Sequence, residues 1–267
     1  MKFLQDITLG QYLPGDSFLH RLDPRTKFLS LLLLMIATFM IRSPAALGLL
    51  GGFFFLSLGL SQLSWGYVFR GVRSFLGLFL FTAVVHFFFT PGPSLPFFPI
   101  GFIDITWTGI GKGAFVAVQL LLAILISSLL TLTTAPLRLA HGLEKMISPL
   151  KRLHLPIEDF SMMTMVAIKF IPILLEEANR IIKAQSARGV DFESGNFFRR
   201  VKNLVPVLTP LFHSVFKRAD ELAIAMLARG FVSGKARTHM QDLKMAGRDY
   251  FVLAAVAGFF ILEMNLG

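Results

Sequence analysis

Residues 113–134 read GAFVAVQLLLAILISSLLTLTT, a run of 22 residues without a single charged side chain. The hydrocarbon core of a bilayer is roughly 30 Å thick, and a helix needs about 20 apolar residues to cross it. The length and composition of this run therefore predict a transmembrane helix. A soluble domain would interrupt such a run with charged residues.

Four other apolar runs have the same character. The first is short for a straight crossing, so we expect it to be tilted or re-entrant. Between the third and fourth runs, closely spaced prolines exclude a helix. The predicted fold class is an all-α polytopic membrane protein with about five transmembrane helices and long amphipathic cytoplasmic helices. The five predicted spans are residues 26–41, 45–63, 74–90, 113–134 and 250–266.

The charged residues are few and unevenly distributed. The 267 residues include 26 Lys and Arg and 16 Asp and Glu, a net charge of +10. Residues 136–249 alone contain 18 of the basic and 11 of the acidic residues. Basic loops alternate with nearly neutral ones, so the positive-inside rule predicts a cytoplasmic N-terminus and an external C-terminus. We expect the basic surface to contact anionic lipids or acidic proteins rather than nucleic acid.

This topology divides the chain into three predicted regions. Residues 1–135 would hold four spans, residues 136–249 would form a cytoplasmic coupling-helix region, and residues 250–267 would form the last span. Within the middle region we predict a short basic helix over 136–153 and two long amphipathic helices over 157–187 and 198–228. Proline is expected to kink the first long helix and to break the first half of the second, and three prolines are expected to serve as hinges. They are Pro172, Pro206 and Pro210.

Both long helices are predicted to end in the tripeptide Ala-Arg-Gly. One interpretation is local, because glycine closes helices with a positive φ and a cation suits the helix C-terminus. The repetition at two helix ends favours a second interpretation, in which each guanidinium binds carboxylates or backbone carbonyls of a partner. The six residues are Ala187, Arg188, Gly189, Ala228, Arg229 and Gly230.

The N-terminal residues 10–27 read GQYLPGDSFLHRLDPRTK. Pro-Gly is typical of a turn, and Asp23 before Pro24 is typical of a helix N-cap followed by proline at the first helical position. We therefore predict a structured cap that anchors the first span.

Several kinds of site are absent from the sequence. No Gly-x-x-x-x-Gly-Lys-Ser/Thr loop occurs, because Lys112 is followed by Gly113 and Lys235 by Ala236. The six histidines lack metal-ligand spacing, and there is no cysteine. We expect no catalytic residue, no metal site and no cofactor in this chain, so energy for transport would come from another chain.

Together, residues 10–27, the two Ala-Arg-Gly ends and the long basic segment before the last span resemble the T component of energy-coupling factor (ECF) type ABC transporters. The resemblance covers nearly the whole chain, and the paired arginine motifs are its most specific part. It implies a non-catalytic subunit, in the plasma membrane of a prokaryote, that joins two ABC-type ATPases to an S component binding a vitamin or metal ion. ATP and Mg²⁺ would be bound by the ATPases. Residues 187–189 would dock in a groove of one ATPase and residues 228–230 in the other.

Two other functions are alternatives to this one. A stand-alone secondary transporter or channel would need ionisable groups at mid-membrane, and the spans offer few. A membrane enzyme acting on lipid-linked substrates would need a paired acid and base, for which Asp159, Glu176 and Glu177 are too generic.

Four smaller features remain. Two Gly-x-x-x-Gly spacings, residues 48–52 and 109–113, predict close helix packing. Glu176 stands four residues before Arg180, the favourable order for an ion pair. His86 and Glu263 lie in or near apolar spans, where each is either functional or snorkels to the outer surface. Lys169 interrupts an apolar helix, and its role stays open.

Overall fold

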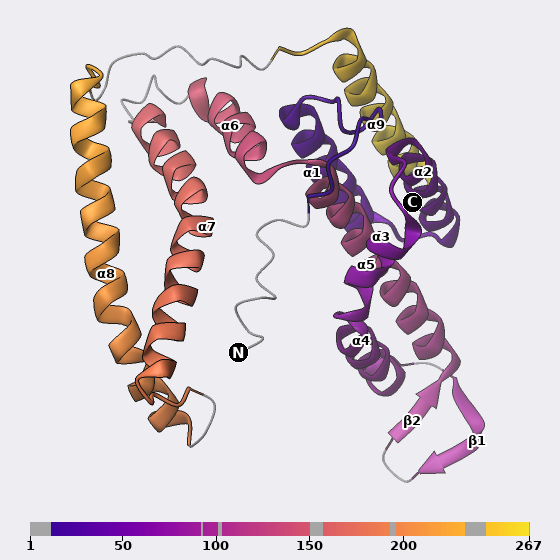
Figure 1. Cartoon of the computed structure of the whole chain (residues 1–267). Coiled ribbons are helices and arrows are strands. Elements are labelled where there is room, and N and C mark those ends of the chain that lie inside the picture. The colour runs from indigo at the N-terminus through magenta and orange to yellow at the C-terminus, as the bar shows by residue number, and fades with distance from the viewer. Residues whose placement is uncertain are drawn as a thin grey trace. The chain divides into compact units, whose positions relative to one another are not determined.

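The computed structural model describes residues 12–91, 93–100, 103–149, 157–192, 196–232 and 244–266. Its architecture is helical, with one small β-hairpin (Figure 1). The predicted all-α fold class is confirmed, and the hairpin occupies the proline-rich segment that was predicted not to be helical. The elements are α1 (Pro24–Met40), α2 (Pro44–Ser61), α3 (Trp65–Arg73), α4 (Leu76–Phe89), β1 (Ser94–Ile100), β2 (Ile103–Thr106), α5 (Trp107–Thr133), α6 (Pro136–Ile147), α7 (Ile157–Ala187), α8 (Phe197–Ala228) and α9 (Gly247–Leu266).

These elements form two compact units. One comprises Tyr12–Ala135 and Leu243–Gly267, so α9 returns to the helices that begin the chain. The other contains Pro136–Asp242, with α6, α7 and α8. The segment between α5 and α9 is therefore an insertion, in the topological sense, into the first unit.

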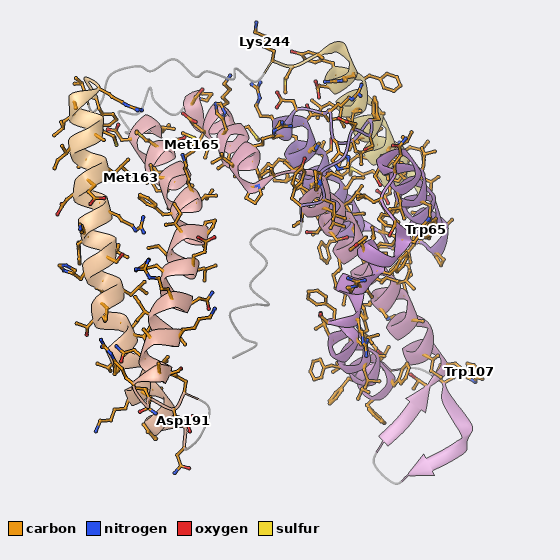
Figure 2. The ribbon with its side chains drawn as sticks, in the orientation of Figure 1. Trp65, Trp107, Met163, Met165, Asp191 and Lys244 are labelled. Carbon is orange, nitrogen blue, oxygen red and sulfur yellow. The ribbon has the colours of Figure 1, made fainter. Side chains whose placement is uncertain are left out.

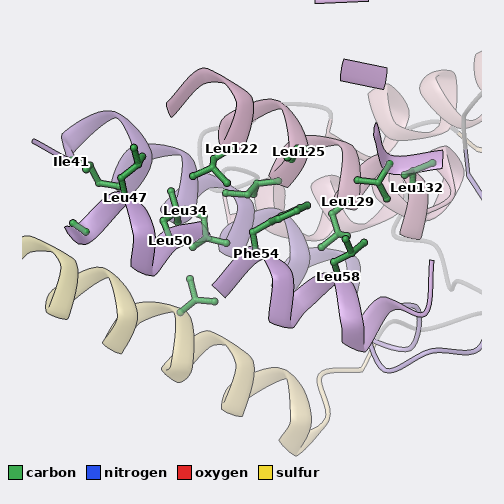
Figure 3. Packing of buried hydrophobic residues seen from close by; sticks show 14 residues of the cluster. Leu34, Ile41, Leu47, Leu50, Phe54, Leu58, Leu122, Leu125, Leu129 and Leu132 are labelled. Atoms are coloured by element: carbon green, nitrogen blue, oxygen red, sulfur yellow. The ribbon is translucent and has the colours of Figure 1, made fainter. Parts of the chain in front are cut away.

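The core of the first unit lies between α1, α2, α5 and α9 (Figure 3). Phe54 and Leu50 of α2 are almost fully buried, as are Leu125 of α5 and Val256 of α9. Leucines contribute most of the remaining contacts. Burial of each such side chain is worth about 1.5–3 kcal/mol in water, whereas between lipid-facing helices close van der Waals packing takes over that role.

The predicted spans differ in how well they suit a membrane. By length and composition two described helices qualify, α2 and α5, and a third span results if α3 and α4, which meet at 57°, count as one. The sequence predicted about five. Helix α1 has 17 residues, which is about 26 Å of helix and shorter than the hydrocarbon core. Helix α9 carries Arg248, Asp249 and Glu263 within its 20 residues.

The predicted N-terminal cap is confirmed from Tyr12 onward, while residues 10 and 11 lie outside the described part. The Asp23 carboxylate accepts a hydrogen bond from the Arg25 backbone N–H (2.9 Å), and Pro24 occupies the first turn of α1. The His20 ring lies between two partners, 2.7 Å from the Ser17 hydroxyl and 3.0 Å from the Leu13 carbonyl. These bonds hold the chain in a fixed turn before α1.

Two buried side chains fasten other helix ends to the first turn of α1. The Lys27 ammonium donates to the Thr133 carbonyl (2.9 Å) and to the Thr134 hydroxyl (3.1 Å) at the end of α5. The Asp249 carboxylate accepts from the backbone N–H groups of Asp23 and Ala246, each at 2.8 Å. Both interactions satisfy backbone groups that helix ends leave without partners. The ends of α5 and α9 therefore meet at one turn of α1.

The two Gly-x-x-x-Gly spacings have different outcomes. A Cβ atom on Gly109 would lie 2.6 Å from the His86 carbonyl oxygen, and one on Gly113 would lie 3.2 Å from the Phe87 ring. Helix α5 thus approaches α4 closely, as predicted. At Gly48 and Gly52 an added Cβ meets nothing within 4 Å. Among the described residues, no helix uses the space that the glycines of α2 leave.

Candidate partner-docking site

Helices α7 and α8 form an antiparallel pair (Figure 1). The Gln185 side chain donates to the Pro206 carbonyl (3.3 Å), and Arg218 lies 3.8 Å from Glu177. Later residues of α7 thus contact earlier residues of α8. The predicted ion pair between Glu176 and Arg180 does not form within 4.0 Å among the described residues. The neighbouring Glu177 contacts Arg218 of α8.

The boundaries of these helices agree with the sequence. Helix α7 spans Ile157–Ala187 as predicted, and α8 begins at Phe197, one residue earlier than predicted. The basic helix α6 ends at Ile147, and its predicted end at residue 153 lies outside the described part. Both long helices continue without interruption through Pro172, Pro206 and Pro210, so the predicted break in α8 is absent and the hinge role stays a prediction.

Both Ala-Arg-Gly tripeptides close their helices in the same way. After α7, Gly189 has φ 88°, its N–H donates to Ser186 (3.0 Å), and the Val190 N–H donates to Gln185 (3.1 Å). This is the Schellman arrangement, in which the last carbonyls of a helix are capped by two backbone N–H groups. The local interpretation of the motif is therefore correct as far as the glycine is concerned.

The second copy repeats this geometry. Gly230 has φ 74°, its N–H donates to Leu227 (2.9 Å), and the Phe231 N–H donates to Met226 (3.0 Å). Glycine adopts such a φ without the steric cost that a Cβ atom brings. The two arginines therefore stand at equivalent positions of two equivalent helix ends.

The arginine side chains take no part in the hydrogen bonds that cap the two helices. Arg188 and Arg229 are both exposed. Within the described residues, neither guanidinium has a hydrogen-bond or ion-pair partner. Each cap is complete without its arginine side chain, so the hydrogen bonds that close the two helices do not require the guanidinium groups. An exposed guanidinium offers five N–H donors that suit carboxylates and carbonyl oxygens of another protein.

The two guanidinium-bearing ends, residues 187–189 and 228–230, lie at opposite ends of the α7–α8 pair. Figure 2 shows Asp191 just beyond the end of α7, far from the end of α8. Because Gln185 contacts Pro206, and Arg229 follows Pro206 by 23 residues, about 35 Å of helix separates the two ends. Such a distance suits two separate binding sites better than one.

Large apolar side chains are exposed along both helices. Met163 of α7, labelled in Figure 2, is 68% exposed, and Phe216 of α8 is 66% exposed. The apolar cleft between α6 and α7 has a volume of about 640 Å³ and is lined by Leu139, Leu143 and Phe160, among others. Exposed apolar surface of this extent is typical of protein or membrane contact. Further exposed apolar residues are Phe160, Ile171, Val205, Phe212, Ile224 and Leu227.

The other candidate residues have distinct settings. Lys169 is exposed on α7 and gains no assigned role. The His86 Nδ1 atom lies 3.3 Å from the Thr90 hydroxyl. Glu263 is 4% exposed, so snorkelling to the surface was a wrong interpretation for this residue. Among the described residues no group of three or more His, Asp or Glu could hold a metal ion.

The importance of Lys27 and Asp249 was not predicted. A lysine that directly follows an N-capped helix start is a weak sign of such a contact. Asp249 had no sign at all, because its partner Asp23 lies 226 residues away in sequence.

Comparison with known proteins gives a consistent result. The family model described as cobalt transport protein (CbiQ) matches residues 15–240. The energy-coupling factor transporter transmembrane protein EcfT of Heliobacterium modesticaldum is 47% identical over 259 residues, covering 97% of both chains. The protein of the same name from Acidaminococcus fermentans is 44% identical over 97% of this chain and 96% of its own. That of Bacillus subtilis is 40% identical over 95% of both.

Proposed function

This chain belongs to the cobalt transport protein (CbiQ) family, among the transmembrane proteins of energy-coupling factor transporters, and on that premise we propose that it couples two ATPases to a substrate-binding S component. The membership confirms the resemblance drawn from the sequence and makes the chain a transporter membrane subunit. The proposal concerns what it does there. It transmits ATP-driven motion, performs no catalysis itself, and leaves ATP and Mg²⁺ to its partners in the plasma membrane of a prokaryotic cell.

The observation that carries the proposal is the pair of equivalent, exposed arginines at opposite ends of α7 and α8. Arg188 and Arg229 have the same backbone geometry and no partner within the described residues. One site for each ATPase explains why the chain has two. A charge-assisted hydrogen bond to a carboxylate is roughly twice as strong as a neutral one.

The exposed apolar side chains of α7 and α8 support contact with the S component. An embedded partner presents an apolar surface, which suits the uncovered Met163, Phe212 and Phe216. Methionine and phenylalanine adapt to surfaces of different shape, because methionine has three rotatable bonds and aromatic rings supply large contact areas. Cargo specificity, for a vitamin or a metal ion, would then reside in the S component.

The test is to replace each arginine and to measure assembly. Arg188→Ala and Arg229→Ala should each weaken one ATPase contact by about 2 kcal/mol, or about 30-fold. The double variant should lose both ATPases and stop uptake. If the two ATPases differ in sequence, the two single variants should release different ones. Copurification from mild detergent and uptake in cells give the two readouts.

Two controls separate docking from folding. The melting temperature should not change in either variant, since the caps are completed by backbone groups. Arg180→Ala removes another exposed arginine from α7, outside the Ala-Arg-Gly motif. It should leave assembly intact. A double variant that retains both ATPases and transports normally refutes the docking role.

A further inference from the structure

A pocket with two charged-type side chains among apolar ones lies where the end of α1 meets the end of α9. It has a volume of about 360 Å³, within the range of small-molecule sites. Both helices belong to the same compact unit. The lining residues are Ala37, Phe39, Met40, Ile41, Arg42, Phe260, Glu263 and Met264.

The Glu263 carboxyl group is buried in this pocket without a partner. The residue is 4% exposed, and neither Oε1 nor Oε2 has a hydrogen-bond partner in the described structure. A buried carboxylate without hydrogen bonds is costly, and such groups in natural proteins are nearly always satisfied by a partner, an ion or a ligand. The Glu263 carboxyl group therefore needs a hydrogen-bond donor, and the described residues do not supply one.

Arg42 lines the same pocket but does not fill this need. It is exposed, and no nitrogen of its side chain comes within 4.0 Å of the Glu263 oxygens. The pocket thus presents a buried carboxyl group and an exposed guanidinium at separate places. A ligand that carries both a positive donor group and a negative group matches this arrangement, whereas a lone cation would be repelled by Arg42.

The surroundings of the pocket are apolar and exposed. Phe39, Met40 and Met264 border it with more than half of their surface accessible, at the ends of two predicted membrane spans. Side chains of this kind are stable in contact with acyl chains. The ligand is therefore expected to have an apolar part next to its charged part.

We propose that this pocket binds the headgroup of a phospholipid with a primary ammonium, with the ammonium at Glu263 and the phosphate at Arg42. An ammonium has three N–H donors for the two bare carboxyl oxygens, and a guanidinium is well suited to phosphate. A trimethylammonium headgroup has no N–H donor. The site therefore distinguishes phosphatidylethanolamine from phosphatidylcholine. This inference does not depend on the docking of ATPases.

The test uses the full-length chain, purified in mild detergent and incubated with an equimolar mixture of the two lipids. Native mass spectrometry should show phosphatidylethanolamine adducts in about tenfold excess, the ratio expected from one charged hydrogen bond. Glu263→Gln should reduce that ratio to near one. Glu221→Gln, which changes an exposed glutamate on α8, is the matched control and should keep it.

Two further arms make the result decisive. Arg42→Gln changes an exposed residue, so it should fold normally, and it should reduce adducts of both lipids. Soluble phosphoethanolamine should fail to displace the lipid, because it lacks the apolar part; displacement would assign the site to a free zwitterion instead. Equal adducts of the two lipids would overturn the proposal. A preference for phosphatidylethanolamine that is unchanged by Glu263→Gln would overturn it as well.

Discussion

Replacing Gly109 by alanine should force α4 and α5 apart. The new Cβ would lie 2.6 Å from the His86 carbonyl oxygen and 2.8 Å from the Thr106 hydroxyl. The carbonyl is backbone and cannot rotate away, while the hydroxyl already accepts from the Gly109 N–H (3.0 Å) as the N-cap of α5. Overpacking costs about 1–3 kcal/mol, and alanine returns up to about 1 kcal/mol of helix propensity. We expect a net loss of about 1–2 kcal/mol.

The matched control is Gly48→Ala in α2, which has the same spacing motif but nothing within 4 Å of the added Cβ. Helix propensity alone should then stabilise this variant by up to about 1 kcal/mol. The two variants should differ in melting temperature by about 5–10 °C, since 1 kcal/mol corresponds to about 2–4 °C for a domain of this size.

The assay is a stepwise heating of each purified variant in the same detergent, followed by size-exclusion chromatography of the surviving monodisperse protein. Equal melting temperatures for the two variants would show that α4 and α5 do not approach as closely as the structure has them. A less stable Gly48→Ala variant would show instead that another element covers that face of α2.

Two other predictions concern the first turn of α1. Lys27→Met keeps the length of the side chain but leaves the Thr133 carbonyl and the Thr134 hydroxyl without their buried donor. The melting temperature should therefore drop by the equivalent of about 1–3 kcal/mol. Asp249→Asn replaces one of two accepting oxygens by an amide donor that faces a backbone N–H, so it should destabilise the protein by a similar amount; Asp220→Asn, exposed on α8, should have no effect in the same melting assay.

The sequence was informative where local chemistry determines the structure. The bounds of α7 follow from a positive-φ glycine at its end and an apolar face along its length, so residues 157–187 were correctly assigned. Hydropathy placed α5 at residue 113, whereas the helix begins at Trp107 because the Thr106 side chain caps it. A cap of this kind adds a polar first turn that an apolar window does not detect.

The remaining features depend on which helices become neighbours. From the sequence, Glu263 was expected near the outer surface, whereas in the structure it is buried in a pocket beside α1. No residue adjacent to Glu263 in the sequence indicates that α1 comes close to it. Likewise, the antiparallel pairing that puts the two arginine motifs at opposite ends is a tertiary property. The motifs themselves were found from sequence because they repeat.

Lys27 and Asp249 determine how the α6–α8 segment is attached to the helices of the first unit. Lys27 holds the chain where it leaves the membrane helices after α5, and Asp249 holds it where it comes back before α9. Asp23 and Lys27, the two points of attachment on α1, are one helical turn apart. The two places where the α6–α8 segment joins the rest of the chain are therefore held by the same turn of α1.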